Sequence, residues 1–131
     1  MSAIIHIDQE TERNGNFRKV LFTGAKSQLV AMSIPVGGEI GEETHDHVEQ
    51  TLYFMSGAGE AVLDGVISPV KEGDVLIVTP GTRHNVRNIG GGPLKVATVY
   101  APPNHIDGRV HATKADADAD AEDEDFGHHV S

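Results

Sequence analysis

The sequence predicts an all-β fold, built as an antiparallel β-barrel or jelly roll. Short runs rich in β-branched and aliphatic residues recur along the chain and are separated by Gly and Pro, as is typical of strands joined by tight turns. No stretch of about a dozen residues keeps an apolar period of 3.6 residues without a helix breaker. The chain has 131 residues, of which 38% are hydrophobic and 5% aromatic, so we expect one domain with a mainly aliphatic core.

Turn residues bound each predicted strand. The candidate strands are residues 3–7, 17–23, 28–34, 50–55, 60–63, 66–70, 74–79, 84–89 and 94–100. The dipeptide Asp64-Gly65 lies between two of these runs and favours a two-residue hairpin turn with positive φ. Further Gly-rich turns keep the strands short and evenly spaced, as barrels and two-sheet jelly rolls require.

The pattern changes after Tyr100. Pro102 and Pro103 cannot continue a central strand, so we expect residues 104–114 to form an irregular segment that wraps the barrel. Residues 115–131 begin with alternating Ala and Asp, and they hold seven acidic residues but no Lys or Arg. Such a segment has too little apolar surface to offset its ordering entropy. The sequence therefore predicts one barrel domain over residues 1–114 and a disordered acidic tail over residues 115–131.

The formal net charge of −10 is concentrated in that tail. Residues 1–114 hold 13 acids and 10 bases, which gives them a net charge of −3. Their Lys and Arg residues are not clustered as they would be to neutralise phosphates, so we expect no nucleic-acid partner. No run approaches the roughly 20 apolar residues that span a bilayer. Residues 1–7 form an apolar stretch that is too short for a secretory signal and lacks its positive charge. We therefore expect no membrane partner and a cytoplasmic location.

Histidines form the most informative pattern. Cysteine is absent, which excludes disulfides and thiolate metal sites and leaves nitrogen and oxygen as metal ligands. His45 and His47 are separated by one residue, and His84 follows 37 residues after His47. Alternate side chains of an extended segment share a face, so we expect His45 and His47 both to point inward. With Gln50 from the next strand and His84 from a facing one, three imidazoles and an amide oxygen would form a site suited to Zn, Ni, Fe, Mn or Cu.

Two sequence frames around these histidines resemble the cupin superfamily. The second cupin motif, in outline G-x5-P-x-G-x2-H-x3-N, is matched at Gly73, Gly81, His84 and Asn88, with the proline displaced by one position to Pro80. This resemblance covers about residues 28–101.

The first cupin motif, in outline G-x5-H-x-H-x3-4-E-x6-G, is matched less closely. His45 and His47 stand as its histidine pair, and counting back from Gly57 puts Gln50 at the carboxylate position. The spacing from His47 to Gln50 is one residue shorter than usual, and Gly38 stands one place before the expected leading glycine. Register favours Gln50 as the fourth ligand, whereas Glu49 is the alternative because a carboxylate binds metal better.

The resemblance implies an antiparallel barrel of about six to eight strands, often a homodimer. It also implies one divalent transition metal inside the barrel, with one or more coordination positions open to water or to a small-molecule substrate.

Further residues are candidates for substrate binding and proton transfer. Leu52 and Phe54 share the face of Gln50 and would line the cavity beside the metal, or they are ordinary core residues. The arginines Arg18, Arg83 and Arg87 have guanidinium groups suited to a carboxylate or phosphate, although solvated surface arginines are more common. Glu49, if it is not a ligand, or Tyr100 is the acid–base candidate. Asn88 shares the face of His84 and is expected to support a loop.

Three functions remain open. The first is a metal-dependent isomerase or lyase that acts on a small oxygenated molecule, such as a sugar or a keto acid. The second is a metal-dependent dioxygenase, for which the same ligand shell would hold iron, copper or nickel. The third is a non-catalytic module that binds a small ligand, since one fold hosts many functions.

Overall fold

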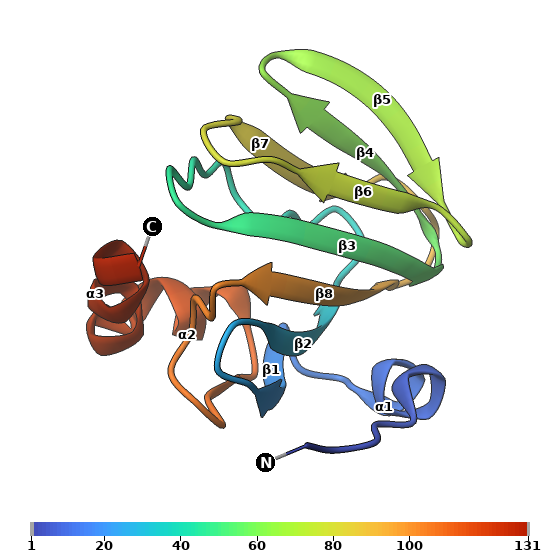
Figure 1. Cartoon of the computed structure of the whole chain (residues 1–131). Helices are drawn as coiled ribbons and strands as arrows, with labels where there is room; N and C mark the ends of the chain where they lie inside the picture. Colours follow the sequence, from blue (N-terminus) through green and yellow to red (C-terminus); the bar gives the residue numbers. More distant parts are fainter. Residues whose placement is uncertain (1, 131) are drawn as a thin grey trace.

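The computed structural model describes residues 2–130 and consists of two antiparallel sheets that face each other as a jelly roll (Figure 1). The six-stranded sheet has the order β6-β3-β8-β2-β1-β9, and the three-stranded sheet has the order β5-β4-β7. The strands are β1 (Arg18–Thr23), β2 (Gln28–Ile34), β3 (Glu49–Ser56), β4 (Ala58–Leu63), β5 (Val66–Lys71), β6 (Val75–Val78), β7 (His84–Asn88), β8 (Leu94–Ala101) and β9 (Val110–His111). The helices are α1 (Ile7–Arg13), α2 (Lys114–Ala119) and α3 (Ala121–Val130).

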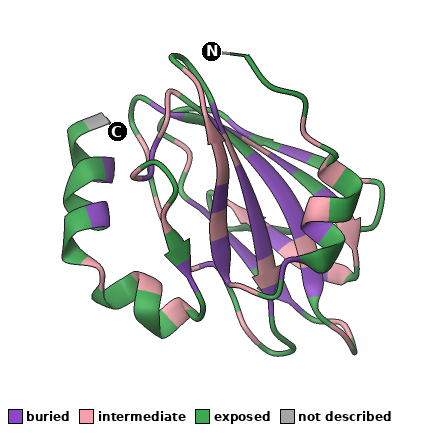
Figure 2. Ribbon diagram, turned by 90° about the horizontal axis from the view of Figure 1, so that it is seen from below, coloured by how far each residue is buried: buried purple, intermediate pink, exposed green. Residues whose placement is uncertain are grey.

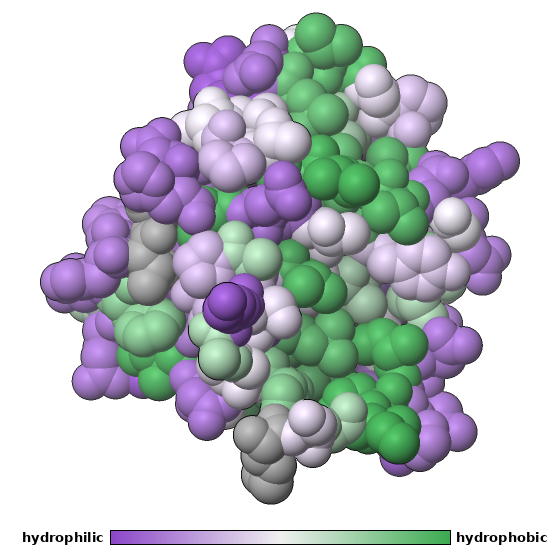
Figure 3. Space-filling view, in the orientation of Figure 1, coloured by the Kyte–Doolittle hydropathy of each residue, from purple (hydrophilic) through white to green (hydrophobic). Residues whose placement is uncertain are grey.

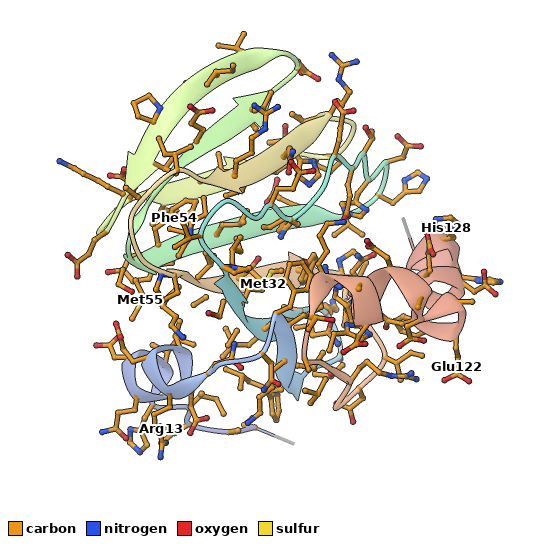
Figure 4. The ribbon with its side chains drawn as sticks, turned by 180° about the vertical axis from the view of Figure 1, so that it is seen from behind. Arg13, Met32, Phe54, Met55, Glu122 and His128 are labelled. Carbon is orange, nitrogen blue, oxygen red and sulfur yellow. The ribbon has the colours of Figure 1, made fainter. Side chains whose placement is uncertain are left out.

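The core lies between the two sheets and follows the two-residue period of the strands. Along β3, Leu52 and Phe54 are 1% and 0% exposed, whereas Tyr53 between them is 41% exposed. Met32 on β2 and Phe54 on β3, both labelled in Figure 4, are fully buried and belong to this core. Most of the buried residues lie on the strands (Figure 2). The core is mainly aliphatic, as the composition predicts.

The all-β prediction is confirmed, and most predicted strands match the observed ones to within a few residues. The hairpin at Asp64-Gly65 is present, since Leu63 pairs with Val66 and the two turn residues have φ values of 48° and 84°. Both values are positive, as the favoured two-residue hairpin turn requires.

The N-terminal strand expected over residues 3–7 is wrong. Residues 2–6 have no regular structure, and α1 follows them. Asp8 and Glu10 lie in the first turn of α1 and Arg13 in its last turn, which suits the helix dipole. The helix packs against β2, β3 and β8, with Thr11 fully buried.

The disorder expected for residues 115–131 is also wrong for the described part, which forms α2 and α3. The Thr113 hydroxyl accepts a hydrogen bond of 3.1 Å from the Asp116 amide and caps α2. Asp120 and Asp123 bond to the wrapping segment through Arg109 and His105, at 2.8 Å in each case. These tertiary contacts order a segment that its composition alone does not stabilise.

The ends of the two predicted ranges, Met1 and Ser131, lie outside the described residues. Among the helices within residues 2–130, none combines the length and apolar character needed to cross a membrane.

Candidate metal centre and cavity

A short antiparallel pairing between residues 39–43 and β7 positions the first two site residues. Glu43 and His84 are directly opposite each other and exchange both backbone hydrogen bonds, each of 2.9 Å. Side chains of directly opposed residues project to the same side of a sheet. This pairing therefore puts the Glu43 carboxylate beside the His84 imidazole.

His45 joins this pair from two residues further along. Its carbonyl accepts a hydrogen bond of 2.7 Å from the amide of Gly81, which holds the segment against the turn before β7. The His45 and His84 ring centroids are 5.5 Å apart with an interplanar angle of 48°. One ligand atom from each of Glu43, His45 and His84 lies within 4.8 Å of the other two.

The donor atoms of this cluster fit a divalent transition metal. Nδ1 of His84 lies 2.9 Å from the Thr82 carbonyl oxygen, to which it is placed to donate its proton, so Nε2 carries the free lone pair that a metal needs. Nε2 of His45 is buried and lies 2.8 Å from Oε2 of Glu43. The angles at this contact do not suit a hydrogen bond, and Nε2 has no other partner among the described residues. Two imidazole nitrogens and one carboxylate oxygen are a ligand set that zinc, iron, manganese and nickel accept.

The electrostatics keep Glu43 ready to bind a cation. Burial alone would raise the pKa of Glu43, but the His45 and His84 imidazoles and the Arg18 guanidinium outweigh it, so the pKa is lowered from its ordinary value. The carboxylate is therefore ionised at neutral pH. The Glu43 side chain is 38% exposed and the His45 side chain 11%, which leaves the centre reachable from one side.

That side opens into a cavity of about 620 Å³ between the barrel and the C-terminal helices. Glu43 and His45 form part of its wall, together with Arg18 of β1 and His105 of the wrapping segment. The opposite wall comes from α2 and α3, including Lys114, Asp118, Asp123, Glu124 and His128. Both helices lie at the end of the barrel where β8 ends (Figure 1), and His128 is on α3 (Figure 4).

The Cupin_2 family model, which describes a cupin domain, matches residues 30–100, more than half of the chain. The chain belongs to the cupin family. It is 40% identical over 120 residues to the uncharacterized protein YrkC of Bacillus subtilis (strain 168), a match that covers 87% of this chain and 64% of YrkC. The chain thus spans just under two thirds of that relative's length.

Solved structures agree with this assignment of the family. The crystal structure of BH2720 from Bacillus halodurans has 40% sequence identity and a TM-score of 0.89, and the match covers 91% of this chain and 95% of that one. A protein with a double-stranded β-helix domain from Klebsiella pneumoniae subsp. pneumoniae MGH 78578 has 31% identity and a TM-score of 0.68, over 79% of this chain and 93% of that one.

The first cupin motif has a different register in the structure from the one its histidines suggest. A bend at residues 46–47 interrupts the extended chain, so the expected alternation fails and His47 is exposed, outside the cluster. The cluster uses Glu43 in its place.

The two irregular spacings in the motif disappear when Glu43 is taken as its first ligand, although Gln50 still stands at the carboxylate position. The frame then reads Gly37-x5-Glu43-x-His45-x4-Gln50-x6-Gly57, with a leading glycine and with a normal spacing to Gln50. Gly37 and Gly57 both have positive φ, 76° and 97°, as the turns at the ends of the frame require. The two irregular spacings in the histidine-based frame were the available signal for this shift.

The two predicted candidates for the fourth ligand lie on opposite faces of β3. Gln50 is 3% exposed on the inner face, and its Nε2 donates a hydrogen bond of 3.1 Å to the Thr98 hydroxyl. Its amide oxygen stays a predicted ligand. Glu49 is exposed on the outer face of this cupin, so it is turned away from the cluster and is no candidate for proton transfer there.

The other residues selected from the sequence lie as follows. Leu52 and Phe54 belong to the hydrophobic core and do not line the cavity. Arg87 is 46% exposed, with nitrogens 4.0 Å from Glu39 and 3.8 Å from Glu60, and it is also outside the cavity wall. Asn88 supports loops, as expected, because its Nδ2 donates to two backbone carbonyls and its Oδ1 accepts from a backbone amide.

Tyr100 and His105 form a second polar group near the centre. The two rings meet edge to face with centroids 4.9 Å apart. Tyr100 is 2% exposed, and burial raises its pKa to about 12. Nδ1 of His105 lies 2.8 Å from Asp123 Oδ2, while its Nε2 has no hydrogen-bond partner among the described residues. Burial is the largest cause of a lowered pKa for His105, and together with the Arg18 charge it outweighs the raising effects of Asp123 and Glu43.

Sequence reasoning gave His105 no role, because a histidine in an irregular polar segment is usually exposed. Its partner is 18 positions away, in a helix that the composition did not predict. Only the acidic tail itself offered a signal, since it holds the carboxylates that this segment needs.

Proposed function

We propose that this cupin is a metal-dependent enzyme that performs isomerase or lyase chemistry on a small oxygenated molecule. The observation that supports it is the triad of Glu43, His45 and His84, which has one side open to a cavity of about 620 Å³. A cavity of this volume is in the range that binds small molecules and cofactors. A bound divalent metal would act there as a Lewis acid that polarises an oxygen of the substrate.

Residues of the chain supply groups that support proton transfer. Asp123 accepts the Nδ1 proton of His105 and fixes its ring, so that Nε2 presents the lone pair of a base. Because burial lowers the pKa of His105, this base is neutral at pH 7. Tyr100 lies outside the cavity wall, but it contacts the His105 ring and is hydrogen-bonded to Arg18. It keeps its proton at neutral pH, because its pKa is raised to about 12.

Metal analysis tests the ligand set. Purified wild-type protein and the variants His45→Ala, His84→Ala and Glu43→Gln are dialysed against buffer with zinc and analysed for bound metal. We expect about one ion per wild-type chain and a sharp loss in all three variants, because each removes one ligand. His47→Ala is the matched control, an exposed histidine in the same loop, and it should bind as the wild type does. Wild-type protein that binds no zinc, nickel, manganese, iron or copper would contradict the proposal.

Substrate turnover tests the reaction. Metal-loaded protein is incubated with a panel of sugars, sugar phosphates and keto acids in deuterated water, and solvent exchange at substrate carbons is followed by NMR. Proton transfer at carbon should insert deuterium into the substrate only when the metal-loaded protein is present. The variant His105→Gln should abolish this exchange. Oxygen consumption in the same samples would favour the dioxygenase instead.

We propose further that two copies associate through the outer face of the six-stranded sheet. Val75 and Ile77 on β6, Tyr53 on β3 and Val99 on β8 are 37% to 58% exposed and form one patch, because Tyr53 pairs with Val75 and both Ile77 and Val99 pair with Thr51. Hydrophobic residues gather in the middle of the face that carries these strands (Figure 3). A patch of this kind suits the self-complementary interface of a homodimer.

A further inference from the structure

Arg18 is a buried cation in the wall of the cavity. The residue is 7% exposed, and it shares the inner side of β1 with Val20. Its strand partner is Met32, a core residue that is 0% exposed. An arginine in such a place has given up most of its hydration, which is costly unless another group compensates for it.

The chain provides only part of that compensation: the Tyr100 hydroxyl is in hydrogen-bonding contact with Arg18, but it carries no charge. No carboxylate oxygen of the described residues lies within 4.0 Å of the Arg18 nitrogens, although ten such ion pairs occur elsewhere in residues 2–130. Nε of Arg18 is buried without a hydrogen-bond partner in the same part of the chain. The guanidinium stacks on the neighbouring Phe17 ring at 5.2 Å, which orients it but adds no acceptor.

Most of the acidic residues around the cavity are engaged with other bases. Asp123 is bonded to His105, Glu42 is 3.2 Å from Arg83, and Asp118 is 2.8 Å from Lys114. Glu43 and Arg18 attract each other only through a longer-range electrostatic interaction. A metal ion bound to Glu43 would neutralise the carboxylate and weaken this attraction. The buried positive charge of Arg18 in the cavity wall therefore lacks a directly bonded negative charge, and an anionic ligand could supply it.

We propose that Arg18 binds the carboxylate group of the substrate in this cavity. A guanidinium pairs with a carboxylate through two parallel hydrogen bonds, and it does so best where water is excluded. The substrate is then a small carboxylic acid whose other oxygen function faces the metal centre, such as a keto or hydroxy acid. This inference rests on the proposed function for the role of the metal, but the anion site itself depends only on Arg18 and the cavity.

Calorimetric titration with malonate tests the anion site. Wild-type protein, zinc-loaded and metal-free, is titrated with malonate and with its neutral analogue malonamide, after free zinc has been removed. We expect saturable binding of malonate and none of malonamide. Arg18→Met should weaken malonate binding by about tenfold or more, whereas Arg18→Lys, which keeps the charge and loses the fork, should weaken it less.

Arg87→Met is the matched control, since it removes an exposed arginine outside the cavity wall. It should leave malonate affinity unchanged. All three arginine variants should retain the zinc content and the thermal unfolding transition of the wild-type protein. Equal affinity for malonate in Arg18→Met and wild type, equal binding of malonamide, or no malonate binding in either form would each overturn the inference.

The metal-free arm separates this inference from the proposed function. Wild-type protein that binds no zinc but binds malonate through Arg18 refutes the metal enzyme and retains the anion site. Protein that binds zinc normally while malonate ignores the Arg18 substitutions retains the metal centre and refutes the anion site.

Discussion

Replacing Glu43 by Gln tests whether a carboxylate has taken the place of a histidine in the metal centre. Gln has nearly the same shape but carries no charge and is a much poorer metal ligand. Loss of a group that only supports a ligand costs about 10–100-fold in metal affinity. Loss of a ligand itself should therefore cost at least about 100-fold, which corresponds to about 2.7 kcal/mol of binding free energy.

The same substitution should scarcely affect folding. The Glu43 side chain is 38% exposed, so its contact with His45 adds no more than about 1 kcal/mol to the stability of the metal-free protein. Zinc affinity is measured by competition with a chromophoric chelator, and unfolding by circular dichroism. Glu49→Gln is the control, because this carboxylate lies on the outer face of β3. The register derived from the pairing of Glu43 with His84 is refuted if Glu43→Gln leaves zinc affinity unchanged and either Glu49→Gln or His47→Ala lowers it by about 100-fold.

Three further outcomes follow from the fold. His105 has a pKa below that of an exposed histidine, so the unfolded chain takes up its proton first and stability should fall as the pH drops below about 6.5. The melting temperature of His105→Gln should fall less steeply from pH 7 to pH 5 than that of the control His128→Gln, and equal slopes would contradict the assignment. Ile77→Glu should convert a dimer to a monomer in sedimentation experiments, whereas Val66→Glu on the other sheet should not; a monomeric wild type would exclude the interface. Leu52→Ala should destabilise the fold by about 2–5 kcal/mol in urea titration without loss of zinc affinity, because this side chain belongs to the core; a variant of wild-type stability with weakened ligand binding would instead place Leu52 in the substrate site.

The sheet could be predicted from the sequence because each strand carries its own signal. β2 has the predicted bounds of residues 28–34, and the Asp64-Gly65 turn fixes the register of β4 and β5 by local backbone preference alone. His84 likewise lies at the start of β7, where the spacing of the second motif indicates it. These features depend on residues close together in the chain.

The remainder depends on contacts between distant segments. Glu43 becomes a site residue through its pairing with His84, 41 positions away in sequence, and a bend turns His47 out of the position that alternation assigns to it. The acidic tail folds because Arg109, His105 and His111 of the wrapping segment bond to Asp120 and Asp123. The alternating Ala and Asp residues contain no local pattern that identifies these partners. Composition alone therefore predicts disorder, whereas contacts with the wrapping segment stabilise helices.

The position of α3 has a practical consequence for work with the isolated protein. Since this helix forms part of the cavity wall, residues added after it would emerge close to the opening. A polyhistidine purification tag fused there would bring additional imidazoles near the centre, where they would compete for the ion in every metal assay. Fusion before α1, which packs against β2, β3 and β8 and lies across the molecule from α3 (Figure 1), keeps such a tag away from the metal centre.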